Sequence, residues 1–71
     1  MRVIIGAEAL AHLDGIFDWI AKDDPAAATR VVGRIFDDLE RLSEFPHIGH
    51  VGREEGTFEW VVPGLPYIII Y

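Results

Sequence analysis

Residues 47–59 contain the side-chain types that cleavage of a phosphodiester requires. That reaction needs a base, an acid and a cation that stabilises the charge developing on the phosphoryl group. Six candidates fall within these thirteen residues, namely His47, His50, Arg53, Glu54, Glu55 and Glu59. Only Arg53 is strongly cationic, and the three carboxylates around it would repel RNA. We therefore favour a solvated loop that leads into a strand, and keep Arg53, Glu59 and His50 as an alternative catalytic set.

The histidines could also suggest a metal site. His47 and His50 have HxxH spacing, and His12 is a third imidazole. Zinc binds imidazole nitrogens. Two histidines three residues apart can point at the same ion when they lie on a helix, but residues 47–50 are expected to form a loop. Cysteine is absent, which excludes thiolate ligands and disulfides. The sequence predicts no metal, and no glycine-rich phosphate motif or other pattern predicts a cofactor.

Composition limits the class of protein and its partners. The chain has 71 residues, of which 51% are hydrophobic, and a net charge of −6. These values predict one small globular domain. Its acidity argues against direct binding of nucleic acid. The chain has no apolar run of about 18 residues and no signal-peptide layout, so we expect a cytoplasmic protein without a membrane interaction.

The first half of the chain reads as a strand followed by two helices. Residues 2–5 include three consecutive β-branched side chains, which predicts a strand. Over residues 7–22 the apolar period becomes helical, with Leu10, Leu13, Phe17 and Ile20 on one face. Asp24 can cap a second helix that starts at Pro25 and continues to residue 45. Its apolar seam comprises Ala28, Val32, Ile35, Leu39 and Leu42. The short turn between the helices predicts an antiparallel hairpin.

The second half reads as a loop and two strands. Residues 57–62 alternate in polarity, and Pro63-Gly64-Leu65-Pro66 connects them to residues 67–71. The last strand is apolar on both faces, which predicts an interior position in a sheet. The expected order is β-α-α-β-β. This pattern predicts an α+β fold in which the helical hairpin packs on a small antiparallel sheet.

The landmarks of the chain resemble the RelE/ParE toxins of bacterial type II toxin–antitoxin systems, and the ParE branch more closely than the RelE branch. They occur in the same order as in that family, over nearly the whole chain. They are Leu13-x-x-Ile16-x-x-Trp19-Ile20-Ala21, Asp24-Pro25-x-Ala27-Ala28, Leu42-x-x-Phe45-Pro46-x-x-Gly49, Gly56-Thr57-x-Glu59 and Val61-Val62-x-Gly64-x-Pro66-Tyr67-Ile68-Ile69-x-Tyr71.

The resemblance implies a toxin of a plasmid-stabilisation type of system, with a cognate antitoxin as its partner. ParE-like members act on DNA gyrase, so gyrase is the expected target and the toxin would act by binding proteins. RelE-like members cut mRNA in the ribosome, which makes a ribosome-dependent endoribonuclease the alternative. An inactive remnant that titrates antitoxin is a third hypothesis. For partner binding we expect Trp60, Tyr67, Ile69 and Tyr71 on the last two strands.

Three departures from the family pattern shape these expectations. Family members continue past Tyr71 into another strand, so residues 1–71 are expected to form a single domain that lacks its last strand. Phe58 and His50 stand where members commonly have arginine. Because positive charge is lost, we expect no nuclease activity. The missing strand predicts a free edge at residues 67–71, through which the chain would form a homodimer or accept an antitoxin strand.

Overall fold

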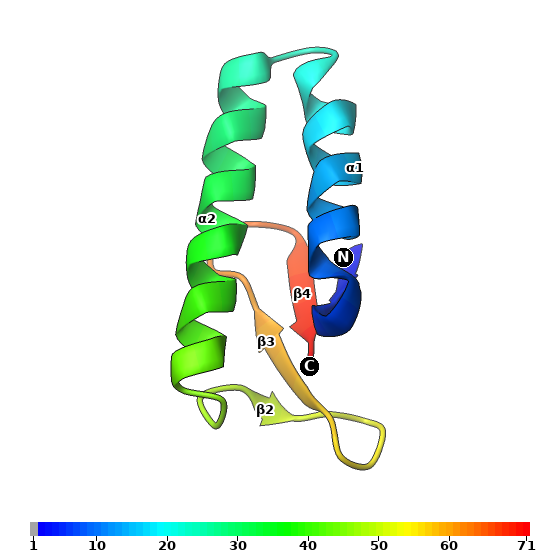
Figure 1. Ribbon diagram of the computed structural model, residues 1–71, viewed down its shortest axis with the longest axis vertical. Helices are drawn as coiled ribbons and strands as arrows, with labels where there is room; N and C mark the ends of the chain where they lie inside the picture. Colours follow the sequence, from blue (N-terminus) through cyan, green and yellow to red (C-terminus); the bar gives the residue numbers. More distant parts are fainter. Residues whose placement is uncertain (1) are drawn as a thin grey trace.

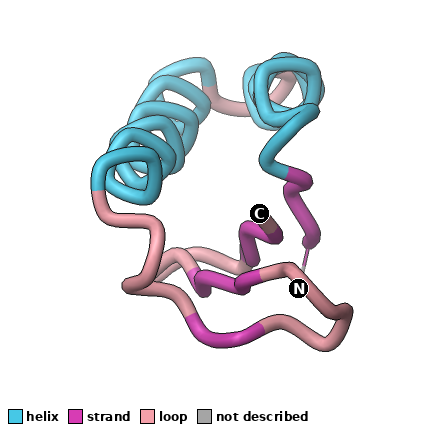
Figure 2. The backbone as a smooth tube through the Cα atoms, turned by 60° about the horizontal axis from the view of Figure 1, so that its bottom comes forward, coloured by secondary structure: helices cyan, strands magenta, loops and turns pink. Residues whose placement is uncertain are grey.

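The computed structural model describes residues 2–71, which fold into two layers (Figure 1). The elements in chain order are β1 (Arg2–Ile5), a 3-10 turn (Gly6–Glu8), α1 (Ala9–Ala21), α2 (Pro25–Glu44), β2 (His50–Val51), β3 (Phe58–Val61) and β4 (Tyr67–Ile70). Figure 2 shows both helices on one side of the strands. The predicted α+β fold with a helical hairpin on one sheet is therefore confirmed. The two-residue strand β2 lies in a segment that was expected to be a loop.

The turn between the helices forms as its residues predict. The Asp24 carboxylate accepts a hydrogen bond of 3.1 Å from the backbone N–H of Ala27, and Pro25 occupies the first helical position. The N–H groups of Asp23 and Asp24 both donate to the carbonyl of Ile20, which closes the end of α1. The N-terminal N–H groups of α2 thus gain an acceptor without lengthening the turn. The helices consequently run antiparallel, side by side.

The buried face of α1 is rotated from the predicted one. Ala9, Leu13 and Ile16 are buried, whereas Leu10 is 72% exposed and Phe17 is also exposed. The predicted face was based on the spacing of apolar residues alone. In the structure α1 also covers the sheet, which turns the Ala9 and Ile16 side inward. On α2 the prediction holds, because its buried apolar residues belong to the expected seam; they are Ala28, Ile35 and Leu42.

The sheet has the strand order β1-β4-β3-β2 and is mixed, not wholly antiparallel as predicted. β1 pairs with β4 in parallel, from Arg2↔Tyr67 to Ile5↔Ile70, while the other two pairs are antiparallel. The chain reverses between α1 and α2 and again between β3 and β4 (Figure 1), and it also reverses where β1 leads into α1 and where α2 leads back to the sheet. An even number of reversals gives β1 and β4 the same direction.

The prediction of a free edge at residues 67–71 is wrong. β4 lies between β1 and β3 and is paired on both sides. The pairing with β3 extends past β4, since Phe58 N–H donates to the Tyr71 carbonyl at 2.7 Å and Tyr71 N–H donates to the Phe58 carbonyl at 2.9 Å. The N-terminal strand occupies the place where a missing neighbour was expected. Homodimerisation through the C-terminal strand therefore loses its structural basis, and the sheet edges are β1 and β2.

The core lies between the sheet and the hairpin. Ile4 of β1, Ile35 of α2 and Ile69 of β4 are each 0% exposed, as is Val62, which follows β3. One face of the sheet and the inward-facing residues of each helix thus shield each other from water. The other face of the sheet faces away from both helices.

Candidate functional site

The sheet surface opposite the helices is the candidate site, and we call it the open face. Alternate residues of a strand point to opposite sides, so the neighbours of the fully buried Ile4 and Ile69 lie on this face. The strand register arranges them in two rows. One row is Val3, Ile68 and Val61, and the other is Ile5, Ile70, Glu59 and His50.

The open face is largely aliphatic and accessible. Val3 is 50% exposed, Val61 is 46% exposed, and Ile68 and Ile70 are half-buried. Two shallow hollows of about 220 and 270 Å³ lie on it, and both are lined by Arg53, Glu59 and Ile70. A contiguous apolar surface with charged groups at its rim is typical of a protein–protein interface.

The loop between β2 and β3 places the charged rim. Gly52 N–H donates to the Thr57 carbonyl at 2.8 Å, and the Thr57 hydroxyl donates to the Glu54 carbonyl at 2.7 Å. A Cβ atom at residue 52 would clash with Thr57, so this close approach requires glycine. The loop brings Arg53 beside Glu59, whose carboxylate oxygen Oε2 accepts a 3.1 Å hydrogen bond from the Arg53 backbone N–H.

Three of the six residues proposed for phosphodiester chemistry come together here. His50 is the cross-strand partner of Glu59, and Arg53 lies beside Glu59 at the same end of the sheet. Directly opposed side chains in an antiparallel pair have Cβ atoms about 5 Å apart. Glu54 and Glu55 are exposed in the loop, and His47 instead packs its ring against Phe58 at 5.7 Å between centroids. The fold thus brings the alternative catalytic set together, and Glu54 lies next to it, because it lines the smaller hollow with Arg53 and Glu59.

The described residues contain no cluster of three or more His, Cys, Asp or Glu side chains that could hold a metal ion. His12 is hydrogen-bonded to β1. Its Nδ1 accepts a 3.2 Å hydrogen bond from the backbone N–H of Ile5, which ties α1 to the end of β1.

The four residues expected to bind a partner belong to the helix-facing side of the sheet. Ile69 is 0% exposed and Tyr67 is 5% exposed, so a protein that docks on the folded chain cannot reach them. Trp60 and Tyr71 are half-buried and packed against the core. The Tyr71 hydroxyl donates to the Pro46 carbonyl at 2.7 Å and accepts from Gly49 N–H at 3.1 Å. Ile68 and Ile70 of the same strand are the accessible residues.

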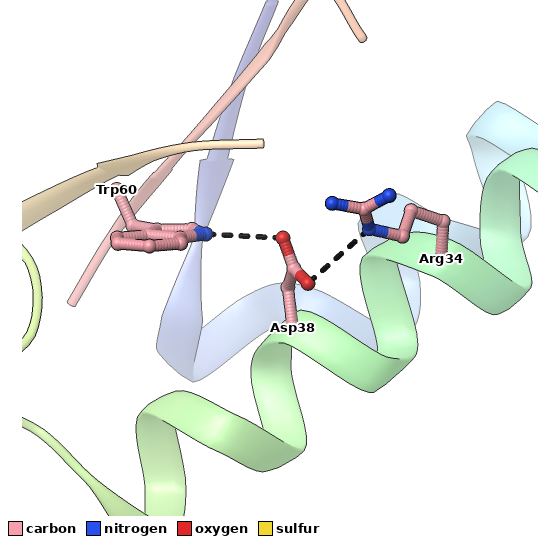
Figure 3. Close-up of polar contacts among 3 residues, drawn as sticks. All are labelled: Arg34, Asp38 and Trp60. Carbon is pink, nitrogen blue, oxygen red and sulfur yellow. Dashed lines mark hydrogen bonds and ion pairs between the residues drawn. The ribbon is translucent and has the colours of Figure 1, made fainter. Parts of the chain in front are cut away.

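Trp60 takes part in a polar link that the sequence analysis did not find (Figure 3). Its indole Nε1 donates to Asp38 Oδ2 at 3.0 Å, and Arg34 Nε donates to Asp38 Oδ1 at 3.4 Å. Asp38 is only 3% exposed. The sequence did carry a signal, because Asp38 falls between Ile35 and Leu42 in the apolar seam of α2, where an acidic residue needs a partner.

A family comparison decides what kind of protein this is. Residues 3–71 match the profile described as "ParE toxin of type II toxin-antitoxin system, parDE". The chain belongs to this family of ParE toxins. The family resemblance found in the sequence is thus confirmed.

A curated relative of this ParE-family chain comes from Sinorhizobium fredii and is named "Putative toxin Y4kP". The two are 49% identical over 63 residues, which cover 89% of the present chain. The chain spans 66% of the length of that relative. No solved structure is significantly similar to the chain. Within residues 2–71, no helix is both long and apolar enough to cross a membrane.

Proposed function

We propose that this ParE-family toxin acts by binding proteins through its open face, with the antitoxin covering that face in the neutralised state. The observation that supports this most is the exposed aliphatic surface built by Val3, Ile5 and Val61 together with Ile68 and Ile70. A sheet face left uncovered by helices normally carries polar residues. Burial of an aliphatic sheet face by a partner lowers the free energy, because apolar surface is removed from water.

The shape and charge of the open face favour, as its ligand, a segment of a partner protein that has one apolar side. The aliphatic residues of the two rows can contact a strand or an amphipathic helix laid across the sheet. Arg53 and Glu59 at one end provide one cationic and one anionic group, which can fix the direction of that segment. The rest of the open face supplies the apolar area that such a segment would bury.

Substitution of one open-face valine tests this proposal. Val61→Lys places a charge in the proposed contact and should weaken antitoxin binding by about tenfold or more, measured by calorimetry with the antitoxin encoded beside the gene. Val51→Lys is the matched control, since Val51 is 82% exposed on β2 and lies outside the open face. Equal affinity of the two variants would reject the open face as the antitoxin site.

For the cellular target we propose DNA gyrase. The free toxin should inhibit supercoiling by purified gyrase, and prior addition of antitoxin should abolish the inhibition. Growth arrest on expression distinguishes an active toxin from an inactive remnant that only titrates antitoxin. Arrest without any effect on gyrase would show that the toxin has another target.

The cross-strand pairing of His50 with Glu59 favours a second candidate function, a ribosome-dependent endoribonuclease. Arg53 would stabilise the phosphoryl charge while His50 and Glu59 exchange protons with the ribose hydroxyl and the leaving oxygen. We rank it lower because Arg53 is the one strongly cationic side chain of the set and adjoins Glu54, Glu55 and Glu59. Discrete mRNA cuts in translating ribosomes that disappear with Arg53→Ala would establish this function instead.

A further inference from the structure

A separate pocket of about 440 Å³ lies between α2 and the turn that joins β3 to β4. Its lining residues are Arg30, Val31, Arg34, Pro63, Gly64 and Leu65. Gly64 has a φ of 77°, which lets the turn reverse beside the helix. The Leu65 N–H donates to the Val62 carbonyl at 3.2 Å and holds the turn in this form.

The pocket presents positive charge in an otherwise acidic chain. Arg30 and Arg34 are one helical turn apart, so their side chains lie on the same side of α2. Arg34 bonds Asp38 through Nε, and within residues 2–71 its two terminal nitrogens form no further hydrogen bond (Figure 3). Within residues 2–71, Arg30 forms no ion pair, and no described Asp or Glu lines the pocket. Several guanidinium N–H groups are therefore free to bind an anion.

The rest of the lining is apolar. Val31 and Leu65 pack against the core from this side, and Pro63 is exposed at the turn. Two guanidinium groups next to an apolar hollow match a ligand that has a carboxylate beside an aliphatic side chain. We propose that this pocket binds an acidic peptide segment of a partner protein, with its carboxylate on Arg30 and Arg34 and an aliphatic side chain against Val31 and Leu65.

Charge elsewhere favours a peptide over a nucleic acid. A strand of nucleic acid that contacted Arg30 and Arg34 would carry further phosphates along α2. There the exposed carboxylates of Asp37, Glu40 and Glu44 outnumber the one exposed cation, Arg41. Repulsion from these carboxylates, together with the net charge of −6, opposes a long polyanion. A short segment with one or two carboxylates avoids this repulsion.

An NMR titration of the whole chain tests the pocket. The probes are the peptide acetyl-GSLEDLGS-amide, its neutral counterpart acetyl-GSLQNLGS-amide, inorganic phosphate and a short single-stranded DNA. The acidic peptide should shift the backbone amide signals of residues 30–34 and 64–65. Arg30→Gln should weaken its binding by about fivefold. Arg41→Gln removes the same charge from the same helix outside the pocket, and should leave the affinity unchanged.

Each alternative result overturns the proposal in a different way. Equal weakening by Arg30→Gln and Arg41→Gln would indicate diffuse charge attraction and no pocket. Equal binding of the neutral peptide would remove the role of the guanidinium groups. Tighter binding of DNA or phosphate at the same amides would assign the pocket to phosphate groups. Because Arg30 is exposed, an unchanged amide spectrum of the free variant should show that its fold is retained.

Discussion

The indole Nε1 of Trp60 donates a 3.0 Å hydrogen bond to Oδ2 of Asp38 and thereby joins β3 to α2 across the edge of the core. Asp38 is nearly inaccessible, and its other oxygen accepts from Arg34. A buried carboxylate is tolerated when both of its oxygens are hydrogen-bonded. This pair is thus a specific connection between the helical layer and the sheet.

Removal of the Asp38 carboxylate should destabilise the chain. Asp38→Ala leaves the Trp60 N–H without its acceptor and should lower the free energy of unfolding by about 1–3 kcal/mol. Asp38→Asn keeps an acceptor for the indole and should cost less. Denaturant titrations of both single variants, Trp60→Phe and the double variant Asp38→Ala/Trp60→Phe measure the coupling between the pair. Strictly additive losses would show that the hydrogen bond contributes nothing to stability.

Truncation in the core should distinguish buried from half-buried positions of α2. Ile35→Ala should cost about 2–5 kcal/mol of unfolding free energy, because Ile35 is fully buried between the layers. Leu39→Ala should cost less, since Leu39 is only half-buried. Phe36→Ala is the control, as its ring is exposed on the same helix. Similar losses at residues 35 and 36 would contradict the observed orientation of α2.

The Tyr71 hydroxyl should hold the segment between α2 and β2. Tyr71→Phe removes the hydrogen bonds to the Pro46 carbonyl and from Gly49 N–H, while the stacking on Phe58 at 5.8 Å is retained. Amide hydrogen exchange at Gly49 should accelerate, with a loss of about 0.5–1.5 kcal/mol in unfolding free energy. Unchanged exchange at Gly49, measured by NMR, would show that another contact holds this segment.

Lysine substitutions at adjacent residues of β4 should have opposite outcomes. Ile69→Lys buries a charge in the core and should prevent folding, because a small domain has little stability in reserve. Ile70→Lys faces the open side, where the ammonium group can reach water, and should leave a folded chain with weakened antitoxin binding. Circular dichroism and gel filtration compare the two. A folded Ile69→Lys variant would require the alternation of β4 to be reversed.

The open face could be predicted only in part. The sequence identified residues 67–71 as an interior strand, and the strand is indeed paired on both sides. It could not say which alternate residues are accessible, because Tyr67, Ile68, Ile69 and Ile70 are all apolar. Polarity that alternates along a strand reveals its solvent side, and β4 has no such alternation.

The sequence by itself determined the helical hairpin and the family. Asp24 and Pro25 predict the start of a helix, because the contacts involved lie within a few residues. The spacing of the apolar residues of α2 predicts which side of that helix is buried. Tertiary structure alone decided the parallel pairing of β1 with β4, the rotation of α1 and the gathering of His50, Glu59 and Arg53 on one face. These features depend on contacts such as Ile5↔Ile70, between residues at opposite ends of the chain. Local sequence patterns do not specify such strand pairings, because these pairings stabilise the chain only after the whole sheet has formed.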